Sequence, residues 1–225
     1  MSAPDDPAFE HLVNQIAHDV RNHAFTMGLQ AEMGQRRSAD APEVKAHFDA
    51  IVRQVDSLRR YLEQLLLFGR PVAAVPGAVD PVALVHTEVE RLRRNSEGGA
   101  SLELRVEGTE GGRRGRWDER LLRHAVRALL DNAVESTTPP PPVVVAVRDA
   151  GDHAEIEVRD AGHGIAPDAL ERMMVPMAVR RPGGAGLGVA IARKMVAAHG
   201  GRLEIESSPA GTTARLVVPW GALNG

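Results

Sequence analysis

The chain has 225 residues, of which 43% are hydrophobic and 25% charged, and a formal net charge of −3, which argues against nucleic-acid binding. It has no cysteine, which excludes disulfides and thiolate metal sites and fits a cytoplasmic protein. No run approaches the roughly 18 apolar residues of a membrane span, and no signal sequence is recognisable. We therefore expect no membrane span and no separate sensor domain.

Two long helices are the first predicted elements. Residues 7–36 carry apolar side chains at steps of three and four, and Pro7 follows two aspartates that suit a helix cap. After a break at 37–42, a second helix is predicted over 42–69, where the apolar residues keep an unbroken four-three spacing. The residues of this spacing are Val44, Phe48, Ile51, Val55, Leu58, Leu62 and Leu65.

Two helices of similar length joined by a short loop form an antiparallel hairpin. A single hairpin leaves part of each apolar stripe exposed, whereas two hairpins packed as a four-helix bundle bury it. The spacing therefore predicts a homodimer.

The rest of the chain mixes helices and strands. Residues 70–79 are rich in Pro, Ala and Val and are predicted to be a linker. Beyond them, helices are expected at 80–94, 118–136 and 187–199, and strands at 102–106, 143–148, 154–159, 202–207 and 213–218. The predicted fold class is α+β, with a helical hairpin over residues 1–72 and an α/β sandwich over 73–225, in which antiparallel strands face a layer of helices.

A histidine on the first predicted helix is a candidate acceptor of a phosphoryl group. His18 projects away from the apolar stripe, with Asp19 beside it and Asn22 one turn further on the same face. A neutral imidazole nitrogen can attack the γ-phosphate of ATP, and a neighbouring carboxylate can fix its tautomer and stabilise the cationic product. Asn22 can position a water for the reverse, hydrolytic reaction. An outward histidine is by itself most often a solvated residue.

Two glycine-rich runs suit a nucleotide. DAGHGI at 160–165 follows a predicted strand, and its glycines permit positive φ and close approach of the backbone. GAGLG at 184–188 opens a predicted helix, and such a turn into a helix N-terminus can hold phosphate. Taken alone, the first run also fits an ordinary polar turn and the second is a weak signal, but their order along the chain strengthens both.

Together these motifs resemble those of sensor histidine kinases. HDVRN at 18–22 is similar to the H-box of that family, LLDNA at 129–133 to its N-box, and the glycine-rich runs to its G boxes. AHGG at 198–201 and GTT at 211–213 also match, so the resemblance covers nearly the whole chain. It implies the Bergerat ATP-binding fold of the GHKL group, which gyrase, Hsp90 and MutL share.

The resemblance implies a role for each motif residue. Asn132 is the expected Mg²⁺ ligand, and Asp160 is the expected acceptor for the adenine amino group. Arg180 and Arg181, near the end of a lid over 166–183, are candidate γ-phosphate contacts. The other expected ATP-binding positions are Gly162, Gly164, Ile165, Gly184, Gly186, Leu187, Gly188 and Thr212.

Several positions depart from the family. His23 replaces a proline that bends the helix below the acceptor, and it places a second imidazole near the site. Ala128 lacks the carboxylate with which the ATPase relatives activate water, which favours transfer to a protein acceptor. The remaining departures are Met174 and Met177 for phenylalanines of the lid, Glu135 for a lysine, and Ala185 for a threonine.

The sequence thus predicts a histidine kinase that binds ATP and Mg²⁺ and phosphorylates itself on His18 with the help of Asp19. The phosphoryl group would pass to an aspartate of a response-regulator receiver domain, and Asn22 would support phosphatase action on that partner. A separate sensor protein is a further candidate partner, because a kinase without a recognisable sensor needs some input. Two alternatives stay open: an ATP-independent phosphotransferase or scaffold on a degenerate kinase fold, and a serine kinase of the anti-sigma type, against which the N-terminal hairpin argues.

Overall fold

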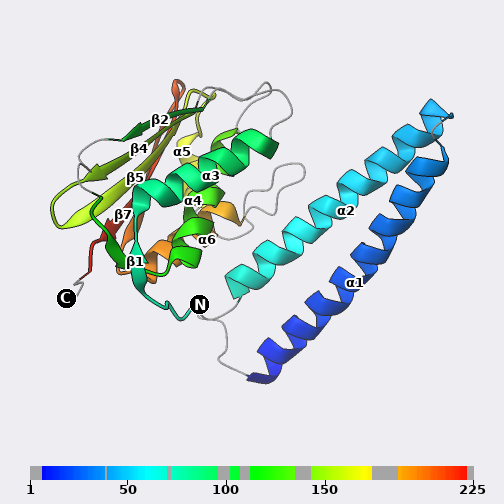
Figure 1. Cartoon of the computed structure of the whole chain (residues 1–225), viewed down its shortest axis with the longest axis horizontal. Helices are drawn as coiled ribbons and strands as arrows, with labels where there is room; N and C mark the ends of the chain where they lie inside the picture. The colour runs from blue at the N-terminus through cyan, green and yellow to red at the C-terminus, as the bar shows by residue number, and fades with distance from the viewer. Residues whose placement is uncertain are drawn as a thin grey trace. The chain divides into compact units, whose positions relative to one another are not determined.

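The computed structural model describes residues 7–38, 40–69, 72–95, 102–106, 112–134, 143–173 and 187–221. Within these ranges, side chains are described from residue 20 onward, apart from those of residues 102–106 and 171. The structure divides into two compact units, one with the two N-terminal helices and one with the sheets and the other helices (Figure 1). No helix in the described ranges combines the length and the apolar character needed to cross a membrane.

The N-terminal unit is an antiparallel hairpin of α1 (Pro7–Arg37) and α2 (Pro42–Gly69). Small residues of α1 let the two helices approach closely. Ala24 is fully buried, and a Cβ atom at Gly28 would lie 3.3 Å from Cγ1 of Val55. The other apolar residues buried in this unit include Ala31, Leu62 and Leu66.

Large apolar side chains remain on the outside of the hairpin. Their exposed fractions range from 40% to 62%, and they are Phe25, Met27, Leu29, Met33, Val44 and Ile51. Met27, Val44 and Ile51 belong to the predicted apolar stripes. A single hairpin therefore buries only part of each stripe.

The second unit is built on a five-stranded sheet with the strand order β2-β4-β5-β7-β6. Its strands are β2 (Leu102–Val106), β4 (Val143–Asp149), β5 (His153–Asp160), β6 (Arg202–Ser208) and β7 (Gly211–Pro219). Neighbouring strands are antiparallel, except that β2 and β4 are parallel. A separate antiparallel pair is formed by β1 (Gly77–Val79) and β3 (Gly115–Trp117).

Helices cover one face of the sheet. The described helices of this unit are α3 (Pro81–Asn95), α4 (Glu119–Val134), α5 (Pro167–Met173) and α6 (Gly188–Ala197). Figure 1 shows α3, α4 and α6 on the same side of the sheet. The core lies between them, because α4 buries the apolar side of its amphipathic pattern there: Leu121, Leu122, Ala125, Val126, Leu129, Leu130 and Ala133.

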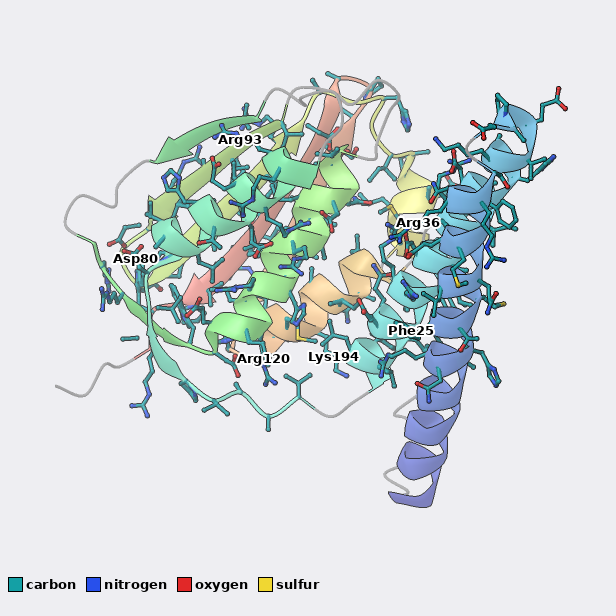
Figure 2. All side chains as sticks on the ribbon, turned by 45° about the vertical axis from the view of Figure 1, so that its right-hand side comes forward. Phe25, Arg36, Asp80, Arg93, Arg120 and Lys194 are labelled. Carbon is teal, nitrogen blue, oxygen red and sulfur yellow. The ribbon has the colours of Figure 1, made fainter. Side chains whose placement is uncertain are left out.

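Aspartates begin two of these helices. Oδ1 of Asp80, labelled in Figure 2, accepts hydrogen bonds from the amides two and three residues ahead, at 2.9 and 3.2 Å. Oδ1 of Asp118 does the same at the start of α4, at 3.0 and 3.2 Å. Each aspartate thus satisfies helix amides that have no partner within the helix.

The other face of the sheet carries a ladder of charges. Glu157 of β5 is almost fully buried between Arg148 of β4 and Arg215 of β7, with N–O distances of 3.1 and 2.9 Å. Burial raises the pKa of Glu157, but the hydrogen bonds and charges of these arginines outweigh burial, so its pKa lies below the ordinary value. Arg202 and Glu204 form an ion pair of 2.7 Å on β6, at the sheet's edge.

The two tryptophans of the chain stack on each other in this unit. The ring centroids of Trp117 and Trp220 are 5.1 Å apart. Nε1 of Trp117 donates to the carbonyl of Pro219 at 2.7 Å, and Nε1 of Trp220 donates to Asp149 at 3.1 Å. The residue after β7 is thereby tied to both β3 and β4.

The predicted α+β fold class is confirmed, and the predicted helices and strands end within one or two residues of the observed ones. The linker prediction over 70–79 is wrong for Gly77–Val79, which form β1, and the expectation of antiparallel strands is wrong for β2 and β4. The short elements β3 and α5 were not predicted. Strands of three residues are too short to show alternation, and Gly115 leaves room that the indole of Trp117 fills.

Candidate functional site

A small cavity lies between the helices and the sheet of the second unit. The residues that line it come from α4, β5, α6, β6, β7 and the loop after β5: Leu129, Asn132, Ala133, Val158, Asp160, Ile165, Val189, Ile205, Thr212 and Ala214. Its volume is about 10 Å³, roughly the room of one water molecule. The fold therefore brings together four of the predicted site residues, namely Asn132, Asp160, Ile165 and Thr212.

Asp160 is the buried acceptor of this cavity. It lies at the end of β5, is 7% exposed, and stands opposite Thr212 in the β5–β7 register. Its Oδ1 accepts a hydrogen bond of 2.9 Å from the amide of Gly162. Within the described residues its side chain makes no other hydrogen bond. Because an ionised carboxylate has lone pairs but no proton to donate, Asp160 suits a ligand that presents an amino group.

The loop after β5 lies directly on the end of the β6–β7 hairpin. Gly164 has a φ of +70°, and a Cβ atom there would overlap the carbonyl oxygen of Ser208. The next amide, of Ile165, donates to Oγ of Ser207 at 2.8 Å. Gly211, with a φ of +134°, leaves no room for a Cβ atom beside the carbonyl of Asp160. Glycine is thus required at both contact points.

Asn132 is held near the cavity by an ion-pair network between α3 and α4. Asn132 is half-buried, and its side-chain amide group makes no hydrogen bond within the described residues. Arg91 of α3 donates to the adjacent Asp131 at 2.7 Å and to Glu88 at 2.8 Å, and Arg127 donates to Glu88 at 2.9 Å. This network fixes the turn of α4 that presents Asn132.

Glu88 is the buried centre of that network and is 1% exposed. Burial raises the pKa of Glu88, but the hydrogen bonds from Arg127 and Arg91 outweigh burial, so its pKa lies below the ordinary value. Glu88 therefore remains ionised in the folded protein at neutral pH.

The start of α6 adjoins the cavity through Val189. Leu187 is fully buried, and Gly188 follows it at the first position of the helix. A Cβ atom at Gly188 would be 3.8 Å from the carbonyl oxygen of Ala128, which is ordinary contact. Further along α6, burial lowers the pKa of Lys194, which is labelled in Figure 2.

The predicted acceptor lies in the other unit. His18 and Asp19 are residues of α1, but their side chains are outside the described part of the structure. Asn22 and His23 are exposed, and the carbonyl of Asn22 accepts a hydrogen bond of 3.1 Å from Thr26.

Several predicted site residues lie outside the described residues altogether. They are Arg180, Arg181, Gly184 and Gly186, together with the variant positions Glu135, Met174, Met177 and Ala185.

Two polar residues of the second unit make contacts that the sequence did not indicate. Oδ2 of Asp118, the cap of α4, accepts a hydrogen bond of 2.9 Å from the amide of Val75. Burial raises the pKa of Asp118, but the hydrogen bonds from Val75 and from the first turn of α4 outweigh it, so its pKa lies below the ordinary value. Ser207 joins the loop after β5 to Thr212, and a serine inside a strand carries no recognisable signal for such a role.

The sequence resembles known ATPase and kinase sequences. Residues 117–222 match the family model of the "Histidine kinase-, DNA gyrase B-, and HSP90-like ATPase". The chain is 29% identical over 206 residues to the sensor histidine kinase ZraS of Klebsiella oxytoca, in an alignment that covers 90% of this chain and 44% of that protein. The chain thus spans less than half the length of this relative.

Solved structures share the fold. Full-length ShkA in complex with AMPPNP has a TM-score of 0.78 at 22% identity, over 96% of this chain and 47% of that chain. The mycobacterial sensor histidine kinase MprB is 30% identical with a TM-score of 0.56, over 64% of this chain and 97% of that chain. The histidine kinase ThkA in complex with the response regulator protein TrrA has a TM-score of 0.65 at 19% identity, over 94% of this chain and 61% of that chain.

Proposed function

Because the chain belongs to the sensor histidine kinase family, we propose that it is a protein-histidine kinase that uses ATP. In this proposal, residues 1–72 form the dimerisation and histidine-phosphotransfer hairpin, and residues 73–225 form the catalytic ATP-binding domain. The observation that carries the proposal is the cavity at which Asn132, Asp160 and Thr212 meet.

The residues of the cavity fit an adenine nucleotide with its metal ion. The carboxylate of Asp160 can accept the adenine amino group, and the apolar wall suits a flat base. The amide oxygen of Asn132, which no described protein group engages, is a suitable ligand for Mg²⁺. When bound, Mg²⁺ would neutralise charge on the phosphates. Because the cavity holds about 10 Å³, its walls must separate when a base enters.

His18 is the proposed acceptor. The lone pair of one ring nitrogen of neutral His18 attacks the γ-phosphorus as the bond from phosphorus to the ADP oxygen breaks, which releases ADP and leaves a cationic phosphoimidazole whose other nitrogen keeps its proton. Asp19 is proposed to hold the other ring nitrogen and to stabilise the cationic product. Asn22, exposed one turn further along α1, is proposed to position a water during dephosphorylation of the partner.

The proposed partners are a second copy of the chain and a response-regulator receiver domain. The exposed apolar side chains of α1 and α2 support pairing of two hairpins into a four-helix bundle. The similarity to ThkA, which was solved in complex with a response regulator protein, supports phosphoryl transfer to a receiver aspartate.

The test is incubation with γ-labelled ATP and Mg²⁺, followed by treatment with acid and with base. We expect a label on the wild type that acid removes and base does not, because phosphohistidine is acid-labile. We expect no label on His18→Gln or on Asn132→Asp. His23→Gln, which removes the second imidazole of the same helix segment, should keep the label and serves as the matched control.

Other outcomes would contradict the proposal in distinguishable ways. An acid-stable label would indicate the serine-kinase alternative. A label that persists in His18→Gln but is lost in His23→Gln would identify His23, and not His18, as the phosphoryl acceptor. One rival is an ATP-independent phosphotransferase or scaffold on a degenerate kinase fold. Absence of both label and nucleotide binding by calorimetry would support that rival.

A further inference from the structure

The hydroxyl of Ser207, which does not itself line the cavity, contacts two residues that do. Its Oγ accepts a hydrogen bond of 2.8 Å from the amide of Ile165 and lies 2.8 Å from Oγ1 of Thr212. It also lies 3.3 Å from the carbonyl oxygen of Gly211, to which it can donate. Ile165 and Thr212 both line the cavity. One side chain on β6 thus contacts the loop after β5 and the polar residue of β7 that stands opposite Asp160.

We propose that Ser207 is a positioning residue for the nucleotide base, which holds the loop at Ile165 and sets the direction of the Thr212 hydroxyl. The inference rests on the proposed function, because it concerns the same cavity. Ser207 itself does not touch the base in this proposal.

The first part of the inference follows from how the loop is held. Gly164 lies so close to the carbonyl of Ser208 that the loop has no freedom to move toward β6. The bond between Ile165 and Ser207 keeps it from moving away. Removing this acceptor leaves the Ile165 amide without its partner, which favours a displaced loop.

The second part follows from counting protons. A hydroxyl group has one proton and two lone pairs, and one lone pair of Ser207 already receives the Ile165 amide. If Ser207 donates to Thr212, the Thr212 hydroxyl keeps its own proton free to donate to a ligand in the cavity. If Ser207 donates to Gly211, Thr212 donates to Ser207 and offers only lone pairs to the cavity. The two arrangements give Thr212 opposite polarities beside the acceptor Asp160: it can donate into the cavity in the first and only accept in the second.

The arrangement in which Thr212 donates into the cavity makes the cavity selective for adenine. Adenine carries an amino group at C6 and an unprotonated N1, whereas guanine carries a carbonyl at C6 and a protonated N1. Two neighbouring groups of defined polarity, Asp160 and Thr212, can therefore distinguish the two bases. Without Ser207, the Thr212 hydroxyl can turn and serve either base.

The test measures the affinities of the full chain for ATP and GTP by calorimetry with Mg²⁺ present. We expect Ser207→Ala to weaken ATP binding about 10-fold and to lower the preference for ATP over GTP by a similar factor. Ser208→Ala is the matched control, because among the described residues the exposed Ser208 hydroxyl makes one hydrogen bond, which it accepts from the amide of Ala210 at 3.2 Å. In a Thr212→Val background, Ser207→Ala should no longer change the preference.

A second measurement needs no nucleotide. Amide hydrogen exchange at Ile165 should be about 10-fold faster in Ser207→Ala than in the wild type, and unchanged in Ser208→Ala. Equal exchange at Ile165 in wild type and Ser207→Ala would overturn the loop contact. An unchanged preference for ATP in Ser207→Ala would overturn the role through Thr212. A wild type that binds neither ATP nor GTP would contradict the proposed function itself. A wild type that binds ATP, with a Ser207→Ala variant of unchanged preference, would contradict only the role of Ser207, so the two failures can be distinguished.

Discussion

Nε2 of His199 accepts a hydrogen bond of 2.9 Å from the backbone amide of Asp118, which is 81 residues away in the chain. Nδ1 of the same ring donates to the carbonyl of Met195 at 2.8 Å. These two bonds require the neutral imidazole with its proton on Nδ1. The histidine of the AHGG run therefore fastens the end of α6 to the start of α4, the helix that carries Asn132.

Replacing His199 with alanine should destabilise the second unit by about 1–3 kcal/mol, because the amide of Asp118 would lose its acceptor. Urea unfolding followed by tryptophan fluorescence measures this change, since both tryptophans lie in this unit. His86→Ala, at an exposed position of α3, is the control and should leave the unfolding midpoint unchanged. Equal stability of His199→Ala and wild type would show that water replaces the bond.

Stability should decrease as the pH falls, in part through Glu88. Its folded pKa lies below the ordinary value of 4.5, so its contribution is complete above that value and is lost as the pH falls through the folded pKa. At neutral pH we expect Glu88→Gln to cost about 1–2 kcal/mol, a figure reduced from that of a buried pair because Arg91 and Arg127 are partly exposed.

The difference between Glu88→Gln and wild type should shrink as the pH falls below 4.5 and through the folded pKa of Glu88, because Glu88 then becomes protonated in the folded as well as in the unfolded chain. Urea midpoints across this pH range measure it. Glu90→Gln is the matched control, since its ion pair with Arg93 is exposed on the same helix and contributes little. A difference that stays constant with pH would mean that packing, not charge, is lost at Glu88.

Gly164→Ala should abolish nucleotide binding. The added Cβ atom would overlap the carbonyl of Ser208, and alanine is also strained at a φ of +70°. Gly151→Ala separates these effects, because Gly151 has a φ of +89° with nothing within 4 Å of the added atom. It should cost only about 1 kcal/mol of stability and leave nucleotide affinity intact. Tight nucleotide binding by Gly164→Ala would contradict the site.

Placing a charge on the exposed apolar face of the hairpin should separate the proposed homodimer. Met27 and Ile51 are 49% and 44% exposed, and a buried unpaired carboxylate at either position would disfavour the bundle strongly. Sedimentation of Met27→Glu and Ile51→Glu should show a monomer where the wild type is dimeric. Val75→Glu, at a 75% exposed apolar residue of the other unit, should remain dimeric.

The sequence predicted most of the fold because its signals are local. The spacing of apolar residues predicted α1 and α2, and the expected ranges 80–94, 118–136 and 154–159 lie within two residues of α3, α4 and β5. The strand β1 escaped prediction because three residues in a Pro- and Ala-rich run show no period. Its partner β3 is equally short, and only long-range pairing defines the two strands.

Residues of the candidate site could be predicted from the sequence where chemistry dictates the residue type, and not where geometry dictates it. Asn132 and Asp160 belong to motifs whose order could be read along the chain. Ser207 and Glu88 each make a contact far away in the sequence, to Ile165 and to Arg127 respectively. A serine in a strand or a glutamate on a helix is ordinary at the level of sequence. Their positions become informative only once burial and hydrogen bonds are known.

The ion pair of Arg202 and Glu204 lies on β6, which is an edge strand of the sheet in the described part of the structure. An open edge of unpaired backbone groups is a template for another strand, and chains with long apolar edges aggregate. Charged side chains along β6 make such an addition costly, because a foreign strand would have to remove them from water. We therefore expect these charges on the outer face of the sheet to disfavour edge-to-edge association of the second unit, while the candidate cavity lies on the opposite face.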